Sequence, residues 1–382
     1  MTDTQHTPGA KHLVLLGAGH AHVHVLQGFA QRRPADLRIT VVAPYPRQLY
    51  SGMVPGFVAG HYALDECVIP LAGLLAGCGA RYVEDSAVAL DAAAKTVTLA
   101  SGEVLAWDWL SLNTGPVMNP GTIDAQMPGA REHALFVRPI EAFAHLWPRV
   151  AALGKNRPVH LAVVGAGAAG LELAMAAAHR LQGSACPPGS RVSLVTGGGA
   201  PAQSYPSGVQ RRVVNALQRL KIAVVPKACV GMVAGGILLA GGEELACDAP
   251  LLAVGAQAPH WLAASDLALD EAGFVSVTSF QQSTSHASVF AVGDVASRAD
   301  VSHPRSGVYA VRAGPGLLVN LRSAVQGLAL QSYQPATRTL NLISCGERYA
   351  IAAWGPMHIE GRWVWRLKDH IDRGFVARYA GR

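Results

Sequence analysis

The chain has 382 residues, of which half are hydrophobic and 15% are charged, and its net charge is +6 at pH 7. This length and composition exclude an intrinsically disordered protein and allow two or three domains with sizeable cores. No segment reaches about 18 uninterrupted apolar residues, so a membrane-spanning helix is not expected. The 41 glycines favour an α/β class, in which helices pack closely on parallel sheets and tight turns recur.

The cysteines are scattered, without a C-x-x-C pair or the spacing of metal ligands. They therefore predict neither a disulfide framework nor a zinc site, and they favour a reducing, cytoplasmic compartment. His20, His22 and His24 alternate, but they lie at the start of an expected helix, which points successive side chains around its axis. No metal site is expected there.

The first motif begins at residue 17, after a short apolar run at residues 13–16. A buried strand, a glycine turn and a helix over residues 21–32 are predicted, followed by a second strand over residues 38–42. Gly17 permits the tight turn, Gly19 lets the backbone approach a pyrophosphate, and the helix N-terminus supplies amide donors. His22 replaces the usual third glycine, and no carboxylate ends the second strand. The ribose contact must therefore be made differently or through water.

A second motif, Gly165-Ala-Gly167-Ala168-Ala-Gly170, has all three glycines and follows another apolar run. A helix over residues 169–181 and a strand over residues 191–196 are expected after it. An acidic residue at the end of that strand would favour NAD, and a nearby arginine would favour NADP. Neither is evident, so NADH, NADPH and an empty ancestral site all stay open.

The two halves repeat the same order of parts. Each has an Asp, six residues and a Gly at the end of an apolar strand, at Asp108 to Gly115 and at Asp248 to Gly255. We infer two Rossmann-type domains, the second inserted into the first, with the chain returning near residues 274–294. The expected divisions are the first part of the outer domain over 10–120, the inserted domain over 121–262, the second part of the outer domain over 263–330, and a small C-terminal α+β segment over 331–382.

The strongest signal is the run Ser288-Val-Phe-Ala-Val-Gly293-Asp294, which lies where it would complete the first fold after the insertion. With Asn113-Thr114-Gly115 and both glycine motifs, it resembles the pyridine nucleotide-disulfide oxidoreductase superfamily over essentially the whole chain. Within it, the sequence resembles type II NADH dehydrogenase-like proteins, especially the group found alone or fused ahead of selenide, water dikinase. Four separated segments carry this resemblance, at residues 16–23, 50–56, 304–312 and 361–373.

The resemblance implies FAD in the first half, with the ribityl chain held by Asp294. It also implies a helix that begins at residues 307–309 and faces the flavin, and a ring lined by Tyr50, Pro55 and Tyr309. Catalytic residues beyond these are unknown, since hydride transfer is the chemistry of the cofactor. The expected FAD-binding residues are Gly17, Ala18, Gly19, His20, Ala21, Pro44, Val88, Thr114, Gly115, Gly293, Asp294, Gly307, Val308 and Tyr309. The expected NAD(P)-binding residues are Gly165, Gly167, Ala168, Gly170 and Gly255.

Two features leave alternatives open. Sulfide-oxidising relatives use separated cysteines near the flavin, which makes Cys345 a redox-thiol candidate, although a buried structural thiol is the favoured interpretation. The tail from residue 361 carries six cations and two anions, and its apolar residues Leu367, Ile371, Phe375 and Tyr379 recur every fourth residue. It predicts a basic amphipathic helix that either lies on an anionic membrane or packs on the C-terminal segment itself.

The leading hypothesis is an FAD-dependent oxidoreductase that takes hydride from NAD(P)H and passes electrons to a quinone or similar small acceptor. The alternatives are oxidation of sulfide or a selenium species, and a flavin-stabilised structural or sensing protein. No nucleic-acid partner is expected, because no motif or basic face beyond the tail supports one. We expect a cytoplasmic protein, peripheral on the inner face of the cytoplasmic membrane if the tail binds lipid. The oligomeric state is left open.

Overall fold

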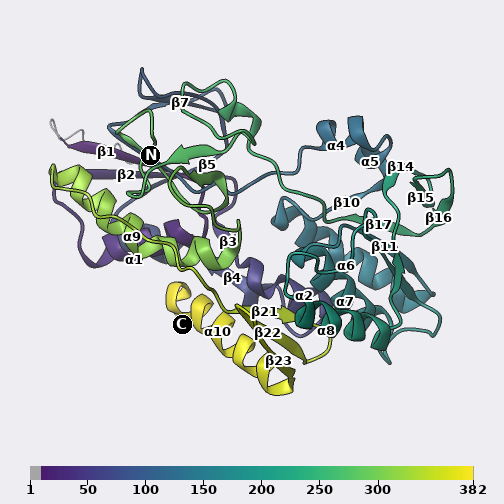
Figure 1. Cartoon of the computed structure of the whole chain (residues 1–382). Helices are drawn as coiled ribbons and strands as arrows, with labels where there is room; N and C mark the ends of the chain where they lie inside the picture. The colour runs from purple at the N-terminus through teal and green to yellow at the C-terminus, as the bar shows by residue number, and fades with distance from the viewer. Residues whose placement is uncertain (1–9, 382) are drawn as a thin grey trace.

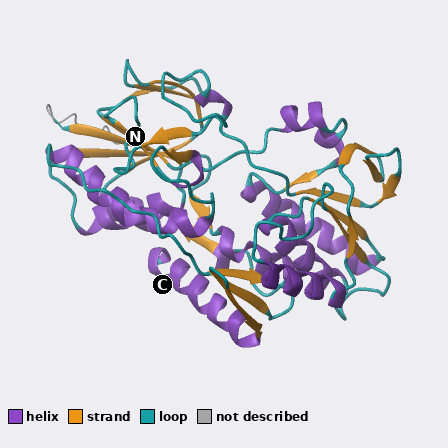
Figure 2. Ribbon diagram, in the orientation of Figure 1, coloured by secondary structure: helices purple, strands orange, loops and turns teal. Residues whose placement is uncertain are grey.

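The computed structural model describes residues 10–381. It contains two five-stranded parallel sheets with helices packed beside them, and a C-terminal unit of three strands and one long helix (Figure 1). The predicted α/β class with two Rossmann-type sheets is confirmed. Figure 2 shows the helices gathered against the strands of both sheets, with the C-terminal helix lying along the lower side of the molecule.

The first sheet has the strand order β19-β9-β1-β2-β5, and every neighbouring pair is parallel. Helix α1 packs against both α3 and α9 beside this sheet. β19 follows the second sheet in the chain but pairs with β9, so the chain returns to complete the first fold, as the sequence predicts. The bounds are β1 (Lys11–Leu16), β2 (Leu37–Ala43), β5 (Arg81–Glu84), β9 (Trp109–Leu112), β19 (Val289–Ala291), α1 (His20–Gln31), α3 (Leu71–Cys78) and α9 (Gly307–Gln326).

The second sheet has the order β10-β17-β11-β12-β13 and is also parallel throughout. Its bounds are β10 (Leu135–Phe136), β11 (His160–Val164), β12 (Arg191–Val195), β13 (Ala223–Val225) and β17 (Ala249–Leu252). The helices of this part are α4 (Pro120–Gln126), α5 (Ala130–His133), α6 (Ile140–Asn156), α7 (Ala168–Leu181) and α8 (Ser207–Arg219).

The segments that connect the two sheets run side by side. Val117 and Gln257 exchange two backbone hydrogen bonds of 2.8 Å. Leu262, which the sequence places at the end of the inserted domain, is fully buried in the core of the first one. The chain therefore returns from the inserted domain to the first domain a few residues before residue 262, where the sequence predicts the boundary.

The two sheets also repeat a set of polar side-chain contacts at the amino end of their first strands. The backbone N–H of His12 donates to Asp108 Oδ2 at 2.6 Å, and the His12 ring lies 2.8 Å from Thr40 Oγ1. The second sheet repeats this arrangement with His160, Asp248 and Ser193, at 2.7 and 2.8 Å. The aspartate that the sequence picks out in each half thus closes the amino end of the first strand of its own sheet.

Short antiparallel sheets extend both domains. One comprises β6 (Ala87–Asp91), β7 (Thr96–Leu99) and β8 (Val104–Ala106); its counterpart comprises β14 (Cys229–Val233), β15 (Gly236–Leu239) and β16 (Glu244–Ala246). Of the remaining pairs, β3 (Arg47–Leu49) with β4 (Val68–Pro70) is antiparallel, and β18 (Val275–Val277) with β20 (Ala296–Arg298) is parallel. Helix α2 (Val54–Ala59) packs against α7 of the second domain and so helps join the two halves.

The C-terminal unit consists of β21 (Asn341–Ser344), β22 (Ala350–Trp354), β23 (Met357–Gly361) and α10 (Arg362–Ala380). The buried side of α10 is formed by Val364, Trp365, Asp372, Val376 and Tyr379. Leu367 and Ile371 are instead 38% and 43% exposed. A four-residue spacing drifts about 40° around a helix of 3.6 residues per turn, so the predicted stripe begins in solvent and ends in the core.

None of the helices within residues 10–381 combines the length and hydropathy that a membrane crossing requires.

Candidate functional site

The first glycine turn is held in place by Asn113, which follows β9. A Cβ on Gly17 would lie 2.6 Å from the Asn113 carbonyl oxygen, and Gly17 also has a φ of +83°. A Cβ on Gly19 would lie 2.4 Å from Asn113 Oδ1. That oxygen accepts hydrogen bonds from the N–H groups of Ala21 and His22, and Asn113 Nδ2 donates to the Val292 carbonyl. Asn113 therefore ties the turn to the ends of two neighbouring strands.

In the first domain, His22 occupies the position of the third glycine of the motif, and its side chain supports the turn. The imidazole is fully buried, with Nδ1 2.6 Å from the Gly17 carbonyl and Nε2 2.9 Å from Ser111 Oγ. At the matching position of the second domain, a Cβ on Gly170 would lie 1.9 Å from the Gly165 carbonyl. The first glycine turn thus leaves room for the His22 side chain, which hydrogen-bonds to the turn. The second turn packs directly against its helix and leaves no room for a side chain at residue 170.

The three alternating histidines face different surroundings. His20 Nε2 lies 3.4 Å from Ser51 Oγ, and His24 Nδ1 lies 3.0 Å from the Tyr379 hydroxyl. Burial, and then the charge of Arg138, lower the pKa of His20 to about 4, so this ring is neutral at neutral pH. Across residues 10–381, no group of three or more His, Cys, Asp or Glu side chains is placed to hold a metal ion.

Most of the residues predicted to bind FAD gather at one edge of the first sheet. Gly17, Pro44, Thr114 and Gly293 follow the carboxyl ends of β1, β2, β9 and β19, which are adjacent in the sheet. Ligands of such sheets bind in the crevice outside the carboxyl ends of the strands. Val88 lies in β6 and is 48% exposed.

Asp294 is deeply set at this edge and faces cations. Burial raises the pKa of its carboxyl group, while the charges of Arg138, Arg305 and His303 oppose that rise. Burial likewise lowers the pKa of Arg138, and the charge of Asp294 counteracts it. No sequence motif includes Arg138, which lies at the entrance to α6. Its place beside both His20 and Asp294 arises only from packing of the two domains.

The N-terminus of α9 completes this edge. Ser306 Oγ is buried without a hydrogen-bond partner among the described residues, and no acidic residue lies in the first turn of the helix. A Cβ on Gly307 would lie 3.5 Å from Ser51 Oγ, so the start of α9 meets the segment that begins at Tyr50. The positive end of a 20-residue helix therefore points at the region shared by Ser51 and His20.

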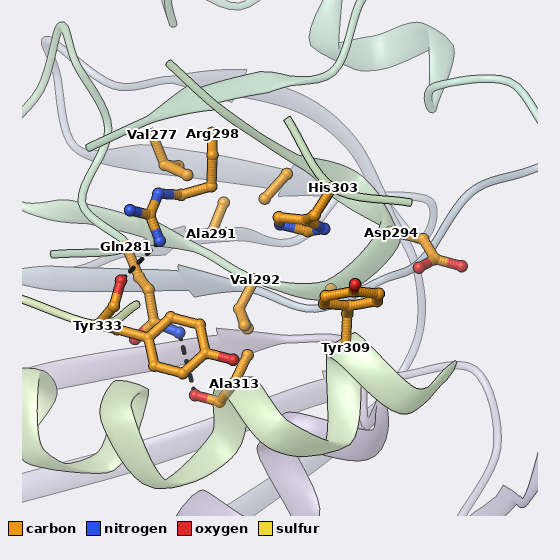
Figure 3. Close-up of a pocket in the computed structure, with 12 residues that line it drawn as sticks. Val277, Gln281, Ala291, Val292, Asp294, Arg298, His303, Tyr309, Ala313 and Tyr333 are labelled. Atoms are coloured by element: carbon orange, nitrogen blue, oxygen red, sulfur yellow. Dashed lines mark hydrogen bonds between the residues drawn. The ribbon is translucent and has the colours of Figure 1, made fainter. Parts of the chain in front are cut away.

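Tyr309 lines a cavity beside Asp294 (Figure 3). Its ring stacks on His303 with centroids 4.8 Å apart, and its hydroxyl donates to the Ala336 carbonyl at 3.2 Å. Gln281 lines the same cavity and leaves Oε1 without a partner among the described residues. In Figure 3 the Asp294 carboxylate points away from this cavity.

Helix α10 covers Tyr50, an association that the sequence did not reveal. The Tyr50 ring stacks on Phe375 with centroids 4.5 Å apart and lies 5.3 Å from the ring of His20. Burial, together with the charge of Asp372 and a hydrogen bond to it, raises the pKa of the Tyr50 hydroxyl. Asp372 also binds Lys368 at 2.6 Å. Pro55 is buried within α2 nearby in sequence.

The second glycine turn presents an open surface. A Cβ on Gly167 or Gly255 would meet nothing within 4 Å, although Gly165 has a φ of +119° and lies against the Ala253 carbonyl. Ala168 is the first residue of α7. At the end of β12, where a ribose-binding carboxylate is usual, Thr196 Oγ1 is buried and unpartnered within the described residues.

Glu172 lies just beyond this turn, and no sequence motif marks it as a functional acid. Its Oε1 accepts a hydrogen bond from the Ser344 N–H at 2.8 Å. Burial raises the pKa of Glu172, and the charge of Lys368 opposes that rise. The acid thus connects the start of α7 to the C-terminal sheet and to the charges beneath α10.

Cys345 is fully buried at the end of β21. Burial raises the pKa of its thiol to about 12, which disfavours the reactive thiolate at neutral pH. All six cysteines are free thiols in the structure.

A family model described as pyridine nucleotide-disulphide oxidoreductase matches residues 11–314 of the chain. An NADH dehydrogenase-like protein of Mycobacterium tuberculosis is 28% identical over 311 residues, which cover 76% of this chain and 74% of that protein. A sulfide-quinone reductase of Aquifex aeolicus is 32% identical over 110 residues, which cover 28% of this chain and only 25% of that enzyme.

Solved structures share the fold. The sulfide:quinone oxidoreductase of Aquifex aeolicus has a TM-score of 0.79 at 18% identity, over 97% of this chain and 92% of that one. NDH2 of Plasmodium falciparum, in complex with NADH, has a TM-score of 0.78 at 13% identity, over 97% of this chain and 99% of that one.

Proposed function

The chain belongs to the pyridine nucleotide-disulphide oxidoreductase family, and from that premise we propose that it is an FAD-dependent NAD(P)H oxidoreductase with a quinone as acceptor. One observation carries the proposal: two glycine turns of the same design open at the carboxyl ends of two parallel sheets within one chain. The similarity to an NADH dehydrogenase-like protein over three quarters of the chain supports the same reaction.

The residues of the first sheet fit FAD. Gly17 and Gly19 carry no side chains in the turn at the start of α1, where a pyrophosphate can approach backbone N–H groups. Asp294, with Arg138 opposite it, offers a carboxylate for hydroxyl groups and a cation for phosphate. When bound, FAD supplies the two-electron chemistry that links a hydride donor to an acceptor.

The start of α9 would stabilise negative charge on the reduced cofactor. Its first N–H groups and the unpartnered Ser306 hydroxyl are donors, and the helix dipole adds positive potential there. His20, whose pKa is lowered, adds no charge of its own at neutral pH. Hydrogen-bond donation by backbone amides would therefore stabilise this negative charge without a charged side chain.

The second turn would bind the nicotinamide nucleotide. Gly167 and Gly255 leave open backbone for the pyrophosphate, and the amino end of α7 lies beside it. Thr196 Oγ1 lies where a ribose hydroxyl would find its partner. Because no carboxylate ends β12 to repel a 2′-phosphate, we expect only weak discrimination between NADH and NADPH.

The C-terminal unit would bring the protein to a lipid surface, where a quinone is found. Its exposed apolar side chains, which we call the C-terminal apolar patch, are Trp354, Met357, Ile359, Trp363, Leu367 and Ile371. Exposed apolar groups beside cationic ones are typical of interfacial membrane binding. Since Phe375 of α10 stacks on Tyr50, the same helix borders the proposed flavin site.

Oxidation of sulfide is the second candidate, supported by the local match to a sulfide-quinone reductase. The buried Cys345 thiol argues against a persulfide route. Anaerobic mixing with NADH, NADPH or sulfide separates these reactions by the flavin absorbance at about 450 nm. Fast bleaching by a nicotinamide followed by reoxidation with a short-chain quinone is the expected result. Bleaching by sulfide alone would replace this proposal with the second one, and no bleaching would overturn both.

A further inference from the structure

A hollow of about 500 Å³ opens at the N-terminus of α10. Its wall is formed by His179, Glu347, Arg348, Tyr349, Arg362, Trp365 and Arg366. His179 lies near the carboxyl end of α7, whereas the Gly165 turn lies at the amino end, about 16 Å away along the helix axis. The hollow is therefore distinct from the second glycine turn, and none of its wall residues belongs to the first.

The cations of this hollow lack anionic partners. The neighbouring carboxylates are engaged by other residues, in the pairs Arg219–Glu347, Arg373–Glu66, Arg373–Asp369 and Arg212–Glu360. Within the described part of the chain, no ion pair includes Arg348, Arg362 or Arg366. Arg348 instead lies over the Trp365 ring, 5.4 Å from its centroid.

The helix adds to the positive potential. α10 has 19 residues, no acidic residue in its first turn, and Gly361 at its N-cap with no side-chain cap. Cations are unfavourable at the positive end of a helix dipole, yet Arg362 and Arg366 lie in its first turn and a half. Together with Arg348 they surround a cavity with unpaired guanidinium groups, the side chains best suited to phosphate.

We propose that this hollow binds the phosphate of an anionic phospholipid headgroup. The phospholipid is favoured over a soluble phosphate ester because Trp363 and Leu367, on the next face of the same helical turns, are 53% and 38% exposed. A headgroup held by the arginines would place its acyl chains along these apolar residues. The inference rests on the proposed docking of the C-terminal apolar patch and specifies which lipid it selects.

The test is flotation of the intact flavoprotein with vesicles of phosphatidylcholine alone or mixed with phosphatidylglycerol. The wild-type protein should prefer the mixed vesicles, and R362Q/R366Q should bind them on the order of thirtyfold more weakly. The control, R149Q/R211Q, removes the same charge from exposed positions of α6 and α8. It should stay within about threefold of wild type, since remote charges are screened.

Three results would overturn the proposal. Equal binding to both vesicle types would leave docking by the apolar patch intact but remove headgroup selection. Equal losses in the two double variants would show that total charge matters and the hollow does not. Protection of the wild-type protein against thermal unfolding by inorganic phosphate, with no response to the mixed vesicles, would assign the hollow to a soluble phosphate. Bound flavin and the unfolding temperature of each variant verify that it is folded, and anaerobic reduction by NADH tests the proposed reaction independently.

Discussion

Replacing Gly170 by alanine should disable reduction by NAD(P)H while leaving the flavin bound. The new Cβ would lie 1.9 Å from the Gly165 carbonyl oxygen and 3.4 Å from the Ala253 Cβ, so the turn must move by about 1 Å to relieve the overlap. Overpacking of this size costs about 1–3 kcal/mol of folding free energy. A displacement of about 1 Å in a positioning element lowers rates about 100-fold.

Stopped-flow measurement of flavin bleaching by NADH tests this prediction at a nucleotide concentration below saturation. The matched control is Gly374→Ala in α10, where a Cβ would meet nothing within 4 Å. Alanine is the better helix former by about 1 kcal/mol, so this variant should be as stable as wild type or more so and should be reduced at the wild-type rate. A Gly170→Ala protein reduced at the wild-type rate would refute the assignment of the second turn to the nicotinamide.

Four further changes test other parts of the site. Asp294→Ala should yield colourless protein, and full retention of flavin would defeat the placement of FAD. Arg138→Ala removes the cation that faces Asp294 and should weaken FAD binding by about tenfold, measured by flavin release on dilution. Thr196→Glu should favour NADH over NADPH by at least about tenfold in kcat/KM, because a carboxylate bonds the ribose and repels the 2′-phosphate. Burial lowers the folded-state pKa of His22 from its ordinary 6.5 to about 4, so the unfolded chain binds the proton more readily and stability is lost as pH falls below 6.5. This costs about 2 kcal/mol at pH 5, and the unfolding temperature of His22→Gln should depend less on pH over this range.

Local sequence was enough to predict the framework of the site. The glycines of both turns, the aspartates at 108 and 248, and the return of the chain at Gly293 all belong to short motifs that can be recognised in one sequence. Gly17 and Gly165, for example, need positive φ and tolerate no Cβ where they lie. Such requirements are visible in one sequence because they restrict the residue type at a single position, even where the contacting atom belongs to a distant segment.

The parts that sequence did not predict come from contacts between distant segments. Arg138 reaches Asp294 only because the inserted domain docks against the first sheet. Tyr50 stacks on Phe375, which lies more than 300 residues further along the chain. The tail is predicted to present one apolar stripe, but Leu367 and Ile371 are exposed while Tyr379 is buried beside His24. The drift of the stripe follows from the spacing, whereas the end that is buried depends on contacts with distant residues.

His22 lies between these cases. The sequence shows that a glycine is missing from the first motif, so this motif alone does not establish a nucleotide site. The structure shows the imidazole bonded to the Gly17 carbonyl and to Ser111, so the substitution supports the turn. A motif can therefore lose a residue and keep its geometry where a neighbouring strand supplies a partner.

The first sheet is proposed to bind FAD, and the flavin itself is the most direct test of that placement. The purified protein should be yellow, and heat denaturation should release one FAD per chain, identified by chromatography against FMN and riboflavin. The pyrophosphate position at Gly17 and Gly19 requires the dinucleotide. Release of FMN, or a protein that stays colourless after incubation with FAD, would show that the first sheet does not hold the dinucleotide.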